Sequence, residues 1–298
     1  MISIVIPTLN QGSFIEETIR SVLSQDYRPI ELLVIDGGSS DETLDVLKSY
    51  EAHEELSWIS ERDGGVTDAV NKGFSLVTGD IVGIQSSDDL YLPGAFTKVA
   101  SAFGGDTELK LVFGEAEYID EDSWVRGKSN VGQFSLLAFL SRKSYILQSS
   151  AFFRRSVIAQ IGGWKSEFSY VADNEFWLRI CMNQKVKSIP DVLSQYRYHS
   201  KQRNTQKERI AHEWSAVIRM SSDIRDMPAI GRLAAQGGVY FTRAHNTDDS
   251  RWIRKSMYTY LALVCYPSLF EVLDKRDITI GYRPVRKIFS KIKRLFFR

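Results

Sequence analysis

The chain of 298 residues has little cysteine, no long apolar run and no common cofactor signature. Its two cysteines, Cys181 and Cys265, are 84 positions apart, which fits neither a disulfide framework nor a zinc site and indicates a reducing compartment. No stretch approaches the roughly 18 apolar residues of a membrane-spanning helix. The first residues, MISIVIPTLNQG, lack the basic segment of a signal peptide and are expected to form a strand.

Several motifs that would define other enzyme classes are also missing. The loop after the first expected strand is PTLNQGSF, not G-x-G-x-x-G, which argues against dinucleotide binding. The phosphate-binding pattern G-x-x-x-x-G-K-[ST] and the nucleophile elbow G-x-S-x-G do not occur. The four histidines form no recognisable zinc pattern. With 43% hydrophobic and 25% charged residues, the chain is nevertheless an ordinary globular protein rather than a disordered one.

Charge is unevenly distributed, although the net charge is only +1. Residues 283–298 contain seven of the 38 basic residues and no acidic one. A short basic tail is typical of binding to an anionic surface, whereas nucleic-acid proteins usually spread basic charge over a folded face, so no nucleic-acid partner is expected. The spacing predicts a basic amphipathic helix in the lipid interface; the alternative is a helix packed on the protein body. Its apolar residues are Val285, Ile288, Phe289, Ile292, Leu295 and Phe296.

The first 114 residues alternate short apolar strands with amphipathic helices, which predicts a mainly parallel sheet covered by helices on both faces. Ser13 is expected to cap the first helix. Ligands bind beyond the carboxyl ends of the strands in such sheets. Polar loops follow four of these ends, and they contain Thr8-Leu9-Asn10, Asp36-Gly37-Gly38, Glu61-Arg62-Asp63 and Ser86-Ser87-Asp88-Asp89. The sequence therefore predicts one polar rim.

The alternation stops after residue 114. Residues 115–131 are expected to form irregular strands, residues 150–163 to contain a helix, and the chain from about residue 205 to be helical. This pattern predicts a catalytic domain over 1–204, with a donor half at about 1–114 and an acceptor half at about 115–204. Residues 205–298 are then a helical C-terminal extension that ends in the membrane-binding helix.

The adjacent carboxylates Asp88 and Asp89 stand at the end of an expected strand. Such oxygen ligands suit Mg²⁺ or Mn²⁺, which could neutralise a leaving diphosphate. The alternative is that one of them only caps the turn before Pro93.

Five motifs taken together are more specific. VIDGGSSDET, SERDGGVTDAVNKG, GDIVGIQSSDDLYLPGA, DNEFWLR and YRYH follow one another in this order. The set resembles family 2 glycosyltransferases of the GT-A fold, a Rossmann-like mainly parallel sheet flanked by helices, and particularly the bacterial polysaccharide-biosynthesis type. The resemblance covers about residues 1–204.

The resemblance implies that a nucleotide-sugar donor lies across the ends of the first strands. Asp36 corresponds to the family's base-contacting acid, and the glycines after it allow close backbone approach; a helix-capping turn is the alternative. Lys72 either contacts a phosphate of the donor or lies on a solvent-exposed helix face. The implied donor-binding residues are Thr8, Asn10, Asp36, Gly37, Asp63, Asp68, Asn71, Lys72, Ser86 and Ser87.

The implied metal site departs from the family pattern. The usual D-x-D motif has Ser86 in its first acidic position, which leaves Asp88 as the main ligand for Mn²⁺ or Mg²⁺ and Asp89 as its support. A site with fewer charges binds metal less tightly. His199 corresponds to a family histidine near the diphosphate or metal; a structural role is the alternative.

The implied acceptor side begins at Asp173, which corresponds to the family's catalytic base. A sugar hydroxyl that attacks an anomeric carbon must lose a proton, and a nearby carboxylate can accept it. Glu175 is the competing candidate. Gln148, Glu175, Trp177 and Arg179 are expected on the acceptor side, although Trp177 also suits the core.

These observations predict an inverting, metal-dependent hexosyl- or N-acetylhexosaminyltransferase that uses a nucleoside-diphosphate sugar, with a UDP-sugar favoured. The expected acceptor is a hydroxyl of a lipid-linked glycan in cell-surface polysaccharide or glycan biosynthesis. The enzyme is expected to be peripheral, on the cytoplasmic face of the inner or plasma membrane. The alternatives are an inactive sugar-nucleotide-binding relative, which Ser86 favours, and a nucleotidyltransferase, which the lack of basic residues in TLNQGSF disfavours.

Overall fold

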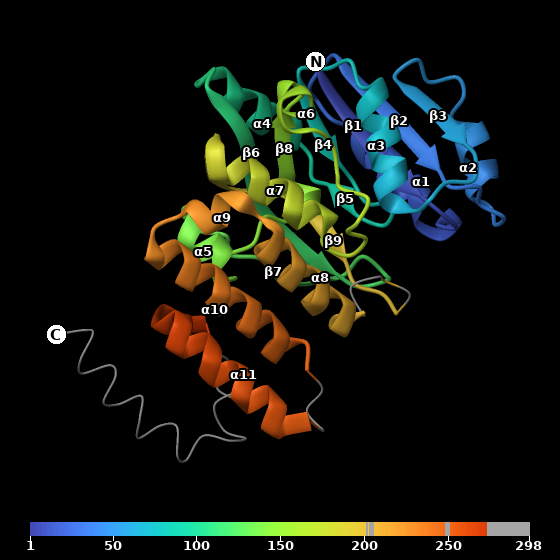
Figure 1. Ribbon diagram of the computed structural model, residues 1–298. Helices are drawn as coiled ribbons and strands as arrows, with labels where there is room; N and C mark the ends of the chain where they lie inside the picture. The colour runs from blue at the N-terminus through green and yellow to red at the C-terminus, as the bar shows by residue number, and fades with distance from the viewer. Residues whose placement is uncertain (201, 203–205, 248–250, 273–298) are drawn as a thin grey trace. The chain divides into compact units, whose positions relative to one another are not determined.

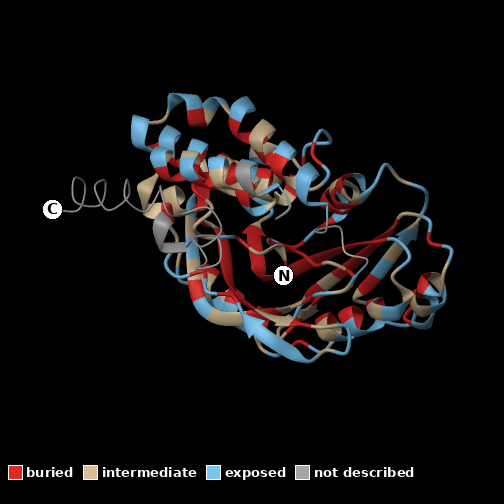
Figure 2. Ribbon diagram, turned by 90° about the horizontal axis from the view of Figure 1, so that it is seen from below, coloured by how far each residue is buried: buried red, intermediate tan, exposed pale blue. Residues whose placement is uncertain are grey.

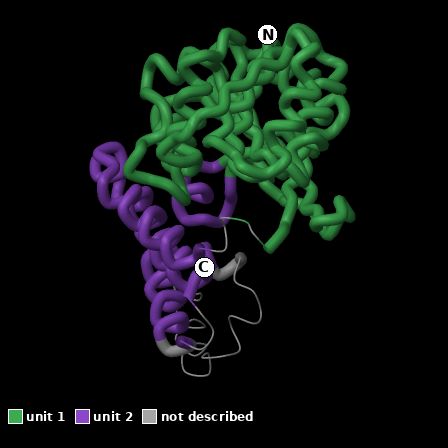
Figure 3. The backbone as a smooth tube through the Cα atoms, turned by 90° about the vertical axis from the view of Figure 1, so that its right-hand side faces the viewer, with its two compact units in different colours: residues 1–134, 146–202 green, residues 135–145, 203–298 purple. Residues whose placement is uncertain are grey.

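The computed structural model describes residues 1–200, 202, 206–247 and 251–272 (Figure 1). Two compact units are present (Figure 3). The first comprises residues 1–134 and 146–202, and the second comprises residues 135–145 and the described residues from 206 onward. The amphipathic helix predicted over 283–298 lies outside the described residues.

The first unit is built on a sheet with strand order β3-β2-β1-β4-β8-β6-β9-β5. In addition, β7 pairs with the C-terminal end of β6. β1, β2, β3 and β4 are mutually parallel, as predicted for the donor half. β8 is antiparallel to both of its neighbours, whereas β9 runs parallel to β6. The strands are β1 (Ile2–Thr8), β2 (Ile30–Asp36), β3 (Leu56–Ser60), β4 (Ile81–Ile84), β5 (Leu90–Tyr91), β6 (Leu109–Ile119), β7 (Val125–Lys128), β8 (Ala151–Arg154) and β9 (Lys185–Arg197).

Helices cover both faces of this sheet, which confirms the predicted α/β class. Ile2, Ile4 and Ile6 of β1 belong to one buried cluster with residues of α1, α2 and α4. Val5 points to the other face, where a Cβ on Gly73 of α3 would lie 2.4 Å from its Cγ1, so only glycine allows α3 to approach this closely. The helices are α1 (Gly12–Leu23), α2 (Thr43–Ser49), α3 (Val66–Leu76), α4 (Ala95–Gly104), α6 (Ser156–Ile161) and α7 (Ala172–Asn183).

Burial follows this layered arrangement. In Figure 2 some strands are buried along their length and others are exposed, whereas the helices alternate buried and exposed sides. The buried strands include β1, β2 and β4, and β7 is exposed. All seven residues of β1 are buried, and so are the first three of β8. Continuous apolar strands of this kind are expected where a sheet is covered on both faces.

One local prediction, the cap of the first helix, was wrong because of a tertiary contact. α1 begins at Gly12, and its start is held by the neighbouring β2–α2 loop, because the Gly12 N–H donates to Oδ2 of Asp41 at 3.1 Å. Ser13 therefore does not cap the helix. The helix predicted within 150–163 is present as α6 (Ser156–Ile161), which ends at Gly162, and the residues before it form β8 between β4 and β6. A short run of buried apolar residues suits a strand as well as a helix.

The second unit is helical, as predicted for the C-terminal region. A Cβ on Gly238 of α10 would lie 2.0 Å from the carbonyl oxygen of Leu140, so α10 packs backbone to backbone against the end of α5. Among the described residues no helix is both long and apolar enough to cross a membrane. Its helices are α5 (Leu136–Leu140), α8 (Lys207–Met220), α9 (Ser222–Asp226), α10 (Ala229–His245), α11 (Trp252–Cys265) and the 3-10 helix η4 (Pro267–Val272).

Candidate active site

The carboxyl ends of the parallel strands meet at one edge of the sheet. Thr8, Asp36 and Ser60 are direct neighbours there, because Thr8 pairs with Asp36 and Asp36 with Ser60 in the strand register. Asn10 joins the first two loops: its N–H donates to Oγ of Ser39 at 2.7 Å, and its Oδ1 accepts the N–H of Ser40 at 2.9 Å. The structure thus forms the rim that the strand pattern predicts.

Asp36 organises the loop after β2. Its carboxylate is buried and accepts the N–H groups of Gly38 and Ser39 at 3.1 and 2.9 Å, and the hydroxyl of Ser60 at 2.6 Å. The hydroxyl of Ser39 also donates to it. These bonds use most of its acceptor capacity, so in this arrangement Asp36 shapes the rim rather than offering its carboxylate to a base.

Asp63 lies where a side chain at position 37 would be. A Cβ added to Gly37 would be 3.1 Å from both carboxylate oxygens of Asp63. Asp63 is half-buried, and its Oδ1 accepts the N–H of Gly65 at 2.8 Å. Asp68 holds the same loop by accepting the N–H of Gly64 at 3.0 Å. Gly37 therefore leaves space for a carboxylate from the next strand along the sheet, which remains on the rim.

Two of the predicted donor-side residues, Asn71 and Lys72, have partners within the protein. Both amide atoms of Asn71 bind the main chain of Trp164, because Oδ1 accepts its N–H and Nδ2 donates to its carbonyl, each at 2.8 Å. Asn71 thus attaches the segment before α7 to α3 instead of facing the donor. Lys72 forms an ion pair with Glu61, which stands in the loop after β3, and its side chain is 24% exposed.

Asp88 and His199 come together, although 111 positions separate them. Nε2 of His199 lies 2.9 Å from Oδ2 of Asp88, and their side chains are 4% and 15% exposed. The ring of Phe14 packs against the imidazole with centroids 5.0 Å apart. Nε2 of Gln148, in the 3-10 helix η1 (Gln148–Ser150), donates to Oγ of Ser86 at 3.5 Å. Ser87, which lies between Ser86 and Asp88 in the sequence, is buried.

Asp89 binds Arg197 and does not help Asp88 to hold a metal ion, contrary to the prediction. It is buried, and its Oδ1 accepts the main-chain N–H of Arg197 at 2.8 Å. Burial and the adjacent charge of Asp88 raise the pKa of its carboxyl well above the usual range. Among the described residues no three His, Cys, Asp or Glu side chains form a metal-binding cluster. Asp88 and His199 are therefore the candidate ligands. Two protein ligands fit a cation such as Mg²⁺, which also takes substrate phosphate oxygens and water.

The acceptor-side motif forms α7. Asp173 stands in its first turn, half-buried, with Nδ2 of Asn174 donating to its Oδ1 at 3.0 Å. Trp177 lies in the core and is fully buried, so its expected contact with an acceptor is replaced by packing against Phe153 and Phe176.

Glu175 and Arg179 are used within the fold. The buried carboxylate of Glu175 lies 2.9 Å from Nη2 of Arg179 and 2.8 Å from Nζ of Lys165. Arg179 also donates to the carbonyl oxygens of Ile161 and Gly163. Glu175 therefore fastens α7 to the segment before it, which leaves Asp173 as the carboxylate of this motif that can act as a base.

Replacing Glu175 by Gln is expected to destabilise the protein by about 3 kcal/mol, because the change leaves two cationic groups without their buried partner. Urea unfolding of the wild type and the variant measures this loss. The matched control is Glu167→Gln, an exposed carboxylate in the same region, which should change stability by less than about 0.5 kcal/mol. Equal midpoints for the Glu175 variant and the wild type would contradict the structural role.

Sequence reasoning missed some contributors to the site. Ser60 at the end of β3 donates a hydrogen bond to Asp36, and Arg197 at the end of β9 donates one to Asp89, just before the neighbouring strand β5. Ser60 is the first residue of SERDGGVTDAVNKG, and Arg197 stands two positions before His199 in YRYH. Their places in these motifs were the available signal, but neither residue was predicted to belong to the site.

Residues 3–162 match Glycosyl transferase family 2. An uncharacterised glycosyltransferase of Mycobacterium tuberculosis is 33% identical over 199 residues, covering 65% of this chain and 74% of the relative. A PGL/p-HBAD biosynthesis glycosyltransferase of Mycobacterium bovis is 31% identical over 189 residues, covering 61% of this chain and 70% of the relative.

Solved structures show a similar fold. S. aureus TarS (residues 1–349) in complex with UDP-GlcNAc superposes with a TM-score of 0.67 at 16% identity, covering 94% of this chain and 83% of that one. The mannosyltransferase PcManGT from Pyrobaculum calidifontis, in complex with GDP-Man and Mn²⁺, gives 0.62 at 17% identity, covering 100% and 87%. Fold and rim together define a glycosyltransferase of the GT-A class. Because the family match spans more than half of its length, the chain belongs to glycosyl transferase family 2.

Proposed function

We propose that this enzyme is an inverting transferase that moves a hexosyl or N-acetylhexosaminyl group from a nucleoside-diphosphate sugar, with a UDP-sugar favoured, to a hydroxyl of a lipid-linked glycan. One observation carries the proposal. In a chain of this family, Asp88 and His199 contact each other at the edge of the sheet where the strands that end in Thr8 and Asp36 also end. Family membership makes the nucleotidyltransferase alternative unnecessary.

The nucleotide end of the donor is assigned to the ends of β1, β2 and β3. The buried hydroxyl of Thr8 has no hydrogen-bond partner among the described residues, which is costly unless a ligand or water satisfies it. Asp63 offers a half-buried carboxylate beside Gly37, and a carboxylate accepts hydrogen bonds from the N–H groups of a base or the hydroxyls of a ribose.

The diphosphate end is assigned to Asp88 and His199. A divalent cation, when bound, supplies positive charge that neutralises the leaving diphosphate. Asp88 would hold it through its carboxylate and His199 through Nε2, while Gln148 and Ser86 border the same position. The complex of PcManGT with GDP-Man and Mn²⁺ supports this assignment by fold.

The chemical step is direct displacement at the anomeric carbon. Asp173 accepts the proton of the attacking acceptor hydroxyl as the new glycosidic bond forms. The bond between the anomeric carbon and the diphosphate oxygen breaks, and its electrons leave with the diphosphate. One displacement inverts the anomeric configuration.

A screen of UDP-, GDP- and dTDP-sugars for thermal stabilisation with and without Mn²⁺ tests the donor assignment. A ligand at 100 times its dissociation constant should stabilise the protein by about 2.7 kcal/mol. We expect a UDP-sugar to give the largest shift and Mn²⁺ to increase it. Stabilisation by none of the nine combinations of nucleotide with glucose, galactose or N-acetylglucosamine would contradict the proposal.

The acceptor class and the location rest on the predicted basic helix over 283–298 and on the PGL/p-HBAD biosynthesis relative. Each Lys or Arg near an anionic lipid surface contributes about 1 kcal/mol. We propose that the enzyme is peripheral on the cytoplasmic face of the membrane, where docking brings Asp173 to a lipid-linked acceptor.

The full chain is expected to sediment with liposomes that contain anionic lipid, and a chain ending at Tyr282 is expected to remain in the supernatant. The truncation removes seven basic residues and the apolar residues between them. Neutral liposomes serve as the control, because they test the contribution of charge. Equal sedimentation of both chains, or no effect of lipid charge, would exclude this tail as the membrane anchor.

A further inference from the structure

Arg197, the last residue of β9, is a fully buried arginine that the proposed chemistry does not use. Each of its three guanidinium nitrogen atoms donates to oxygen atoms. Nε donates to the carbonyl oxygen of Asp88 at 2.9 Å, and Nη2 to Oε2 of Glu17 in α1 at 2.7 Å. Nη1 contacts the turn after β6, namely Oγ of Ser123 at 2.8 Å and the carbonyl oxygens of Glu121 and Asp120 at 3.1 and 3.2 Å.

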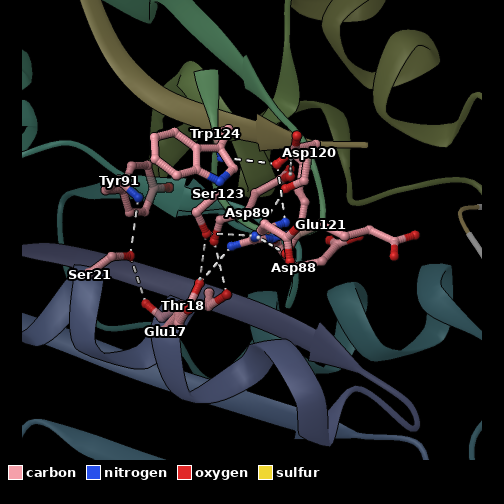
Figure 4. Close-up of polar contacts among 12 residues, drawn as sticks. Glu17, Thr18, Ser21, Asp88, Asp89, Tyr91, Asp120, Glu121, Ser123 and Trp124 are labelled. Atoms are coloured by element: carbon pink, nitrogen blue, oxygen red, sulfur yellow. Dashed lines mark hydrogen bonds and ion pairs between the residues drawn. The ribbon is translucent and has the colours of Figure 1, made fainter. Parts of the chain in front are cut away.

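These partners come from three separate parts of the chain. Figure 4 shows Glu17 and Thr18 on one side and Asp88, Asp89, Asp120, Glu121 and Ser123 on the other, with dashed contacts converging between them. A second bond adds to the connection, since the hydroxyl of Thr18 donates to the carbonyl oxygen of Asp89 at 2.9 Å. Arg197 therefore ties α1, the end of the β4 loop and the 120–123 turn together.

Only an arginine suits this position. A guanidinium offers five donors in a fixed plane, whereas a lysine offers three donors around one point. A buried charge also needs compensation: Glu17 supplies the carboxylate, and the ring of Phe14 lies 5.1 Å from the guanidinium carbon. Losing these bonds would remove the guanidinium donors from the carbonyl groups of Asp88 and Glu121, whereas the carbonyl of Asp120 also accepts the N–H of Ser123.

The same arginine holds both members of the Asp88–His199 pair. Its main-chain N–H binds Asp89, its side chain binds the carbonyl of Asp88, and His199 follows two positions later. The ring of Phe14 contacts both the guanidinium and the imidazole. The separation of 2.9 Å between Asp88 and His199 thus depends on the hydrogen bonds that hold Arg197 in place.

We propose that Arg197 is a positioning residue for the diphosphate end of the donor, because it fixes the main chains of Asp88 and His199 against α1 and the 120–123 turn. That the ligand is a donor diphosphate rests on the proposed function, whereas the contacts of Arg197 come from the structure alone.

Calorimetric binding of UDP and of uridine, both with Mn²⁺, tests this role. Arg197→Lys should weaken UDP binding by about 10–100-fold, as supporting partners of metal ligands typically do, and should leave uridine binding unchanged. The matched control is Arg126→Met, because Arg126 contacts the carboxylate of Asp120 from an exposed position and does not reach Asp88. It should bind both ligands like the wild type. If the donor screen selects GDP, then GDP and guanosine replace these probes.

Glu17→Gln is a second variant for the case that Arg197→Lys fails to fold. The side chain of Glu17 is 56% exposed, so this change is expected to leave the fold intact. It removes only the charge partner of Arg197 and should weaken UDP binding in the same selective way, but by a smaller factor. Wild-type UDP affinity in Arg197→Lys, or an equal loss for UDP and uridine, would overturn the inference.

Hydrogen exchange of the unliganded protein separates this inference from the proposed function. In Arg197→Lys the main-chain amides of 87–91 and 120–125 should exchange faster, whereas those of β2 should not change. If the wild type binds no nucleoside diphosphate, the proposed function fails, and faster exchange in both segments still supports the role of Arg197. Unchanged exchange in both segments would overturn it.

Discussion

Replacing Asp173 by Asn is expected to lower kcat by about 10²–10⁴-fold while the KM for the donor stays close to that of the wild type. The amide keeps the shape of the side chain but cannot accept the proton of the acceptor hydroxyl. In free-energy terms this is about 3–5 kcal/mol of lost transition-state stabilisation. Steady-state kinetics with saturating acceptor measure both parameters.

The Asp173 prediction has a matched control and a clear opposite result. Glu167→Gln removes an exposed carboxylate just before α7 and should leave kcat unchanged. If Asp173→Asn instead abolishes donor binding while turnover of bound donor remains high, Asp173 is a donor or structural residue. Glu175 could then be reconsidered as the base, although its ion pairs with Lys165 and Arg179 argue against that role.

Asp88→Ala is expected to raise the Mn²⁺ concentration needed for activity and to weaken donor binding, each by at least about tenfold. The reason is that Asp88 is the one carboxylate of the strand-end motif that faces His199, while Asp89 is buried against Arg197. Activity measured over a series of Mn²⁺ concentrations gives the first effect, and calorimetric titration with UDP gives the second.

Ser86→Asp is the paired variant, and its expected effect has the opposite sign. It restores a carboxylate at the first position of the motif, so a lower Mn²⁺ concentration should suffice for half-maximal activity. Full activity of the wild type in excess chelator would remove the metal from the mechanism. In that case His199 would have to stabilise the leaving diphosphate directly, because the carboxylate of Asp88 repels it.

The parallel half of the fold could be predicted because its signals are local. Strands of continuous apolar residues alternate with helices of matching period, and this pattern determines both the sheet and its polar rim. The start of α1 and strand β8 could not be predicted in the same way. Asp41 in a different loop holds the start of the helix, and β8 is a strand only because β4 and β6 lie on either side of it.

The site shows the same division between sequence and structure. Motifs indicate which residue types gather at the rim, and the pairing of Asp88 with His199 agrees with that expectation. They do not indicate how each side chain is used. Asn71 binds the main chain of Trp164, and Glu175 forms ion pairs within the fold. These outcomes depend on contacts between segments far apart in the sequence, and Arg197 is the clearest case.

The central claim is that this enzyme cleaves the bond between a sugar and a diphosphate by a single displacement. NMR of a reaction of wild-type protein with an α-linked UDP-sugar and Mn²⁺ tests it most directly, because it identifies both products. The account predicts release of UDP together with a sugar that first appears as the β anomer. Release of UMP and a sugar phosphate, a sugar that first appears as the α anomer, or no release above the rate without enzyme for any donor of the screen would contradict it.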